Sequence, residues 1–209
     1  KLYASWIWVY SLSKLVAADG DDGDYFGVSV AISGDYAIVG ARGDDHDGDQ
    51  AGSAYLFRRT GMYQWDFGTK ITAPDIAAGD LFGHSVGISG DYAIVGAYGD
   101  DGEADNNFSS GSVYIYRRTG TNAWDDVSKI YAPDGALHDY FGVSVAIDGD
   151  YAVVGASGED PNGDDSGSAY VLRRTGTNAW DSVTRIIAPD GDRVDRFGGA
   201  VAISGDYVI

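Results

Sequence analysis

Short runs in which large and small residues alternate recur along this chain, and turns rich in glycine and aspartate separate them. Residues 26–32, 36–41, 53–59 and 69–72 form one such group, and a period of two residues is typical of β-strands. None of these runs has the 3.6-residue spacing and the capping residues of a helix. The pattern predicts a unit of four short strands joined by turns and loops.

The unit recurs every 56 to 59 residues, each time after an Asp-x-Phe-Gly sequence. A fixed period of this length is typical of solenoids and propellers, in which neighbouring units bury one another's apolar faces. Four strands per repeat predict an all-β fold, a β-propeller whose innermost strands start at the phenylalanines of these sequences. The four phenylalanines are Phe26, Phe82, Phe141 and Phe197.

The repeat divides residues 1–209 into blades of a single propeller domain. Three blades cover residues 26–81, 82–140 and 141–196. A fourth combines residues 197–209, which match strands one and two, with residues 1–25, which match strands three and four. Joining the termini in this way hides two sheet edges. The alternative is that the chain is a fragment of a larger propeller or part of a larger assembly.

The units resemble FG-GAP repeats, the family that builds the propeller of integrin alpha subunits. The resemblance rests on the Phe-Gly pairs and on Val-Gly-Ala at 39–41, 95–97 and 154–156, where the family usually has Gly-Ala-Pro. It implies a non-enzymatic module for adhesion or structure, outside the cell or on its surface. The family's calcium loop lies between strands one and two. Here a Gly-Asp turn such as Gly34-Asp35 replaces that loop, so the family's calcium site is not transferred to this chain.

Composition narrows the classes of partner. The formal net charge of −18 argues against nucleic acid, whose phosphates need Lys and Arg, and fits a cation-rich extracellular setting. No apolar run is long enough to span a membrane. The chain has no cysteine, which rules out disulfides and thiolate metal sites. Its three histidines form no catalytic triad or zinc spacing with other residues, so we expect no enzymatic activity.

Most of the 32 acidic residues lie in the loops between strands two and three and between blades, which share one face of a propeller. Ca²⁺ prefers several hard oxygen ligands from such loops, so it is the expected cofactor. The alternative is a solvated acidic rim. The candidate calcium ligands are Asp45, Asp47, Asp49, Asp101, Asp105, Asp160 and Asp164.

A tryptophan and an arginine pair recur at the opposite rim of each blade. Exposed rings beside polar groups stack on sugars, so the alternative function is a lectin that binds a glycan. The other interpretation is that each tryptophan covers the outer strand and stacks on an arginine through a cation–π contact. The candidate ligand-binding residues are Trp65, Trp124, Trp180, Arg59, Arg118 and Arg174.

Three smaller motifs complete the pattern. The Asp of each Asp-x-Phe-Gly is expected to accept backbone N–H groups in a turn. Arg42-Gly43-Asp44 is an Arg-Gly-Asp tripeptide on a loop expected to be exposed, and three-residue matches arise easily by chance. Asn107 begins an N-glycosylation sequon, which matters only in a secreted eukaryotic protein. The sequence therefore predicts a binding module whose partner is a protein or a glycan.

Overall fold

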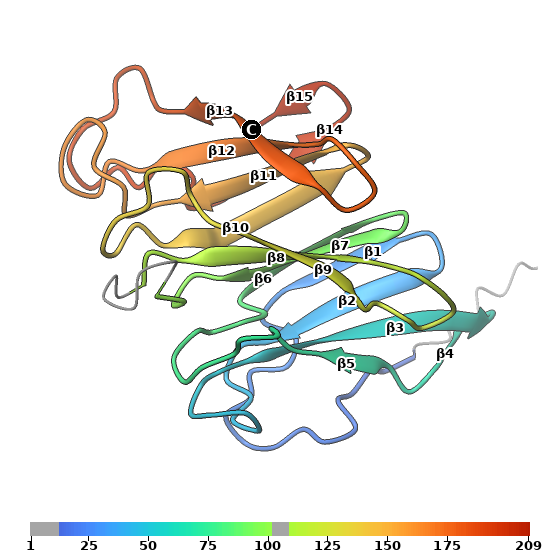
Figure 1. The fold of residues 1–209 in the computed structure, drawn as a ribbon. Helices are drawn as coiled ribbons and strands as arrows, with labels where there is room; N and C mark the ends of the chain where they lie inside the picture. The colour runs from blue at the N-terminus through green and yellow to red at the C-terminus, as the bar shows by residue number, and fades with distance from the viewer. Residues whose placement is uncertain (1–12, 102–108) are drawn as a thin grey trace, which may run out of the picture.

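The computed structural model describes residues 13–101 and 109–209, and this part of the chain contains strands but no helix (Figure 1). None of its segments is a helix that could cross a membrane. The strands form four antiparallel sheets, one for each repeat. They are β1 (Val30–Ser33), β2 (Tyr36–Ala41), β3 (Ser53–Gly61), β4 (Gln64–Trp65), β5 (Thr69–Ile71), β6 (Ser85–Ser89), β7 (Tyr92–Ala97), β8 (Ser112–Arg117), β9 (Asp126–Ile130), β10 (Phe141–Asp148), β11 (Tyr151–Ala156), β12 (Ser168–Arg174), β13 (Trp180–Ile186), β14 (Ile203–Ser204) and β15 (Tyr207–Val208).

Each sheet is an antiparallel meander, as the alternating pattern predicts. We call residues 26–81, 82–140, 141–196 and 197–209 units 1 to 4. Strand order within a sheet follows the chain, β6-β7-β8-β9 in unit 2 and β10-β11-β12-β13 in unit 3. Strands one and two meet at a glycine with positive φ, such as Gly90 at 57°, a conformation that costs glycine little. The four-strand unit is therefore confirmed in units 2 and 3, while the sheet of unit 1 has a fifth strand and that of unit 4 has two strands.

The sheets stack on one another in chain order, and the core lies between them (Figure 1). Between units 1 and 2, Ile38 and Leu56 pack with Val86 and Val95, all nearly or fully buried. A second cluster joins units 2 and 3 in the same way. No unit buries its apolar residues alone, which is the expected behaviour of a repeat protein.

The Phe-Gly pair of one unit contacts the Val-Gly-Ala strand of the preceding unit. A Cβ on Gly96 would lie 2.0 Å from the carbonyl oxygen of Gly142, and one on Gly40 would lie 1.9 Å from that of Gly83. Ser85 Oγ donates a hydrogen bond to the Gly142 oxygen at 2.7 Å. Only glycine permits this backbone approach, so the two glycines of the repeat are explained by one contact.

The expected starts of the first strands are wrong in three of four units. Strand β10 begins at Phe141, but β1, β6 and β14 begin three to six residues after their phenylalanines. The cause is the backbone around the Phe-Gly pair. Leu81 and Gly83 both have positive φ, 57° and 87°, so the chain turns there, and in unit 3 the same turn is a break in register between Phe141 and Ser144, after which regular pairing begins. Phe82 and Phe141 are fully buried, whereas Phe26 and Phe197, in the first and last units, are only half-buried.

The units are not closed into a ring in this structure. Leu15 and Ala17 pack on the outer side of unit 1, and β14 contacts β10 of unit 3. These segments lie at opposite ends of the stack (Figure 1). The described part of residues 1–25 therefore does not form a sheet with β14 and β15, and the composite fourth blade stays a prediction.

Candidate functional site

A buried polar network fixes the base of the acidic loop in unit 1. The Tyr55 hydroxyl lies 2.8 Å from Asp19 Oδ1 and 3.0 Å from Asp44 Oδ2. Lys70 Nζ forms ion pairs with the same two carboxylates, at 2.8 and 2.7 Å. Asp44 is the first acidic residue of the loop after β2, and it is 4% exposed. The network therefore joins the outer strand, the loop after β2 and the segment before the unit.

Unit 2 has the same arrangement. The Tyr114 hydroxyl lies 2.8 Å from Asp75 Oδ1 and 3.0 Å from Asp100 Oδ2, and Lys129 Nζ is 2.7 Å from each carboxylate. Unit 3 replaces the lysine with arginine and one aspartate with glutamate. Those residues are Tyr170, Asp134, Glu159 and Arg185. The exchange of Asp–Lys for Glu–Arg keeps the charge balance of the network.

The network of unit 1 is ionised at neutral pH. Burial disfavours the charge on Asp44, but hydrogen bonds from Lys70 and Ser53 prevail and its pKa lies below the usual value. Burial also opposes the charge on Lys70, yet its two carboxylate partners raise the lysine pKa. Burial and the nearby Asp100 charge raise the pKa of Tyr114, so this phenol stays protonated.

One further carboxylate lies beside the networks in two units. Asp80 and Asp139 are 6% and 5% exposed. Each accepts one backbone N–H in a turn, from Ala77 at 2.7 Å and Ala136 at 2.6 Å. The turn role expected for the Asp of Asp-x-Phe-Gly is therefore confirmed. Burial raises the pKa of both Asp80 and Asp139 to about 6, and the neighbouring acidic charges contribute to the same shift.

The candidate calcium ligands lie at the exposed tips of the acidic loops. Asp45 Oδ1 and Asp160 Oδ1 accept the backbone N–H of Gln50 and Asp165, each at 2.7 Å. Within residues 13–101 and 109–209, no three His, Asp or Glu side chains are placed to hold a metal ion. Asp105 lies outside these ranges, and the calcium site stays a prediction. The exposed candidates are Asp45, Asp47, Asp49, Asp101, Asp160 and Asp164.

The Arg-Gly-Asp tripeptide is not displayed as expected. The Asp44 carboxylate is buried in the network with Lys70, and the Arg42 guanidinium lies 5.0 Å over the Tyr25 ring. A ligand that reads this tripeptide needs both charged groups free, so the structure favours the chance match. The sequon at Asn107 lies outside the described residues.

At the opposite rim, tryptophan and arginine side chains contact the preceding unit of the stack. Trp124 is 4% exposed and packs edge-on against Tyr36 of the preceding unit, with ring centroids 5.6 Å apart. Arg118 lies 4.5 Å over the same Tyr36 ring and pairs with Asp91. The expected cation–π contact thus exists, but its ring is a tyrosine rather than the tryptophan.

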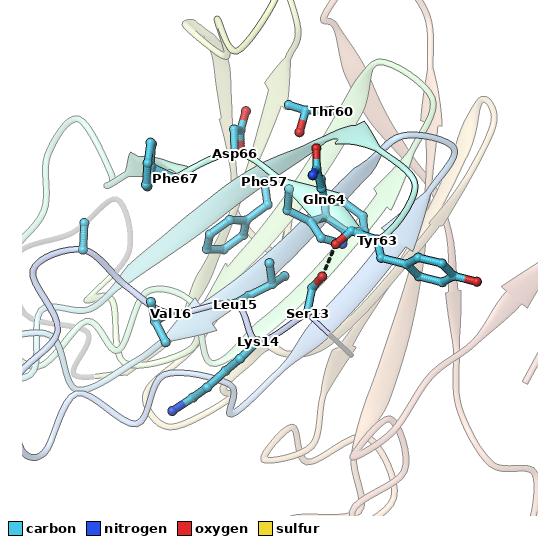
Figure 2. Close-up of a pocket in the computed structure, with 12 residues that line it drawn as sticks. Ser13, Lys14, Leu15, Val16, Phe57, Thr60, Tyr63, Gln64, Asp66 and Phe67 are labelled. Atoms are coloured by element: carbon cyan, nitrogen blue, oxygen red, sulfur yellow. Dashed lines mark hydrogen bonds between the residues drawn. The ribbon is translucent and has the colours of Figure 1, made fainter. Parts of the chain in front are cut away.

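Unit 3 repeats this contact, and unit 1 does not. Trp180 is 8% exposed and packs against Tyr92, which also lies 4.7 Å below the Arg174 guanidinium. Arg59 pairs with Asp35, while the half-buried Trp65 lines a cavity of about 520 Å³ (Figure 2). The six candidate ligand-binding residues therefore do not form an equivalent site in every unit.

Sequence reasoning missed the Tyr–carboxylate–cation networks. A signal was present, because a Lys or Arg follows the repeated Trp by five residues in units 1 to 3. The positions are Lys70, Lys129 and Arg185. A lone cation in the outer strand of each of units 1 to 3, in an acidic chain, indicates a buried acidic partner.

The comparisons with known proteins give one finding. A family model described as the FG-GAP repeat matches the chain four times, over residues 10–57, 65–116, 124–172 and 180–209. No curated protein matches the chain.

Proposed function

The chain belongs to the FG-GAP repeat family, and on that premise we propose a non-enzymatic, extracellular or cell-surface binding module. Its units are the blades of a β-propeller. The loops between strands two and three contact a protein or glycan ligand for adhesion. This proposal rests on the family membership and on the exposed acidic loops that recur in units 1 to 3.

The observation that carries the proposal is the contrast between the base and the tip of each acidic loop. At the base, Asp44, Asp100 and Glu159 are buried and bound to a cation and a tyrosine. At the tip, carboxylates such as Asp47 and Asp164 are exposed. A fixed base holds exposed charge in a defined position, which lowers the entropy cost of binding. Exposed acidic groups also steer a partner with complementary charge.

Binding arrays test this proposal. The full chain is applied to arrays of extracellular proteins and glycans, with Ca²⁺ and with a chelator. We expect a saturable ligand whose binding weakens in the variant Asp47→Asn/Asp49→Asn/Asp164→Asn. A control variant removes three exposed carboxylates near the other rim: Asp125→Asn/Asp181→Asn/Asp206→Asn.

The control variant should bind as the unmodified chain does. Equal weakening in both variants would show a non-specific effect of net charge and contradict a binding role for the loops. Absence of any saturable ligand on either array would contradict the proposed function itself.

Calcium belongs to the same proposal. Carboxylates crowded on one face repel one another, and a cation bound only by the folded state stabilises it by about 2.7 kcal/mol at a hundredfold excess over Kd. Thermal melting at fixed ionic strength compares Ca²⁺, Mg²⁺ and Na⁺. We expect a rise in Tm selective for Ca²⁺ and lost in Asp45→Asn/Asp47→Asn. Equal effects of the three ions would show that salt only screens the acidic face, without a specific calcium site.

The lectin alternative gains no support from the rim that suggested it. Sugar stacking needs an open ring face, and the rings of Trp124 and Trp180 are almost completely covered. Glycans remain among the ligands to be tested for the acidic loops.

A further inference from the structure

The junctions between units 1 and 2 and between units 2 and 3 contain the same tyrosine contact. At the first of them, the Tyr36 ring packs edge-on against Trp124 of the following unit. Arg118 lies over the same ring and donates a hydrogen bond to its hydroxyl at 3.0 Å. Each unit therefore places one tyrosine against a tryptophan and an arginine of the unit that follows it. The equivalent residues at the second junction are Tyr92, Trp180 and Arg174.

Unit 1 has the tryptophan and the arginine of this contact without a tyrosine from a preceding unit. Trp65 lines the cavity of about 520 Å³ on the outer side of unit 1. Figure 2 shows this cavity, with Phe57 and Leu15 among its lining residues. Arg59 pairs with Asp35 as the other two arginines pair with their aspartates, but in the described part of the chain no tyrosine hydroxyl accepts a hydrogen bond from it. The cavity is thus the place that the repeat assigns to a tyrosine.

Unit 4, at the other end of the stack, has the tyrosine without the tryptophan and the arginine (Figure 1). Tyr207 holds the repeat position of Tyr36 and Tyr92, because each of the three directly follows a Gly-Asp turn. The Tyr207 side chain is 81% exposed, whereas Tyr36 is 7% exposed. The two parts of one repeat contact therefore lie at the two ends of the same chain.

A charged contact is divided between the two ends in the same way. At the internal junctions, an aspartate after the outer strand of one unit pairs with the cation in the outer strand of the next, as Asp75 does with Lys129. Lys14 has the position of that cation, because an Ala-x-Asp sequence begins three residues after each of them. Asp190 ends the same sequence after unit 3 and has the position of that aspartate. Both side chains are exposed, and neither has an ion-pair partner among the described residues.

We propose that copies of this chain associate end to end, with unit 4 of one copy docked on the outer side of unit 1 of the next. Tyr207 of the first copy packs against Trp65 and Arg59 of the second, and Asp190 of the first pairs with Lys14 of the second. Both contacts repeat a geometry that the chain already forms at its internal junctions. Neither contact involves residues 1–12, which lie outside the described chain.

The partner is a second copy because the two halves of each contact lie at opposite ends of a linear stack (Figure 1). One copy cannot join its own ends without a change in the angles between its sheets. Opposite charges at the two ends favour the head-to-tail orientation over two like ends. A head-to-tail interface leaves one end of each kind free, so it builds rings or open filaments rather than a two-fold symmetric dimer.

Sedimentation equilibrium of the full chain over a range of concentrations measures this association. We expect a mean mass that rises with concentration from one copy to two or more. Tyr207→Ala removes a side chain that is 81% exposed, so the fold is unaffected, and it should weaken association at least about tenfold. Leu137→Ala removes an apolar side chain that is 52% exposed in unit 2, and it should leave association unchanged.

Charge reversal tests whether the partner is a second copy. Lys14→Glu gives a chain with two acidic ends, and Asp190→Lys gives one with two basic ends, so each variant alone should associate about tenfold more weakly. An equimolar mixture of the two brings opposite charges together at every junction between unlike copies, and it should associate as the unmodified chain does. Asp125→Lys changes the net charge equally at an exposed position in unit 2 and should have no effect.

Three results would overturn the proposal. The first is a chain that stays monomeric at every concentration. The second is unchanged association of the Tyr207→Ala chain. The third is a mixture of the Lys14→Glu and Asp190→Lys chains that associates no better than either alone, which would show that the two ends do not meet between copies. Failure of the acidic loops to bind a ligand would leave this test unaffected, because association is measured on the chain alone.

Discussion

Two groups of carboxylates at the bases of the loops have pKa values that move in opposite directions. Hydrogen bonds from Lys70 lower the pKa of Asp19, and those from Lys70 and Ser53 outweigh burial to lower that of Asp44. Burial raises the pKa of Asp80 and Asp139 to about 6, and neighbouring acids add to the shift. The first group stabilises the fold when ionised, and the second when protonated.

Stability should therefore rise on mild acidification. The contribution of Asp80 and Asp139 is fully present below the unfolded pKa of 3.8 and is lost as pH rises through about 6. We expect each to add about 1 kcal/mol to the free energy of unfolding between pH 7 and pH 5. Below pH 3.8, stability falls because Asp19 and Asp44 become protonated.

Urea denaturation at pH 7, 6 and 5, at fixed ionic strength, measures this effect. Burial lowers the pKa of His84, so this residue makes the fold less stable on acidification. The effect of Asp80 and Asp139 is therefore measured as the difference between the unmodified chain and a variant. The variant Asp80→Asn/Asp139→Asn keeps the acceptor for the turn and removes the titration. Its stability should gain less between pH 7 and pH 5 than that of the unmodified chain. Identical gains would contradict the raised pKa values.

The four phenylalanines of the repeat should differ in their contribution to stability. Phe141 is fully buried between units 2 and 3, so truncation to alanine should cost about 3–5 kcal/mol. Phe26 is half-buried, and Phe26→Ala should cost less. Urea melts of the two variants test the order. A larger loss for Phe26→Ala would contradict the stacking of units that buries Phe141.

At the scale of the element, sequence pattern predicted much of each unit. Alternation located the second and third strands well, because these strands are bounded by turns with clear Gly and Asp signals. It misplaced three of the four first strands, since positive φ at non-glycine residues such as Tyr25 and Leu81 leaves no sequence signal. The pairing of Lys129 with Asp75 and Asp100 was also missed, because it joins residues far apart in the chain.

Replacing Lys129, which pairs with Asp75 of unit 1 and Asp100 of unit 2, should weaken the contact between these units. The Lys129 side chain is 19% exposed, and the Asp100 side chain is 6% exposed, so Lys129→Met leaves a buried carboxylate without its cation. We expect a loss of about 2–3 kcal/mol, below the 3–5 kcal/mol of a fully buried pair.

Arg59→Met provides the control at an exposed ion pair. Arg59 and Asp35 are 53% and 60% exposed, and such pairs contribute less than about 1 kcal/mol. Urea denaturation compares the two variants. Similar losses would mean that the network around Lys129 adds nothing beyond a surface ion pair.

At the scale of the whole molecule, the units form a linear stack in which each contacts its neighbours. The stability of such a protein is the sum of unit and interface terms. Sequence repetition predicted the units and their order. Whether they close into a ring depends on the angle between successive sheets, and the repeat pattern does not encode that angle.

The close backbone contact between Phe-Gly and Gly-Ala recurs at each junction of units 1 to 4, and one glycine substitution tests it most directly. Gly96→Ala places a Cβ 2.0 Å from the Gly142 oxygen, whereas Gly120→Ala places one 3.5 Å from Ala123 Cβ. In urea denaturation we predict a loss of more than about 3 kcal/mol for Gly96→Ala, at or beyond the upper range for overpacking. Gly120→Ala should change stability by less than about 1 kcal/mol. A Gly96→Ala chain as stable as the unmodified one would contradict the stacked arrangement.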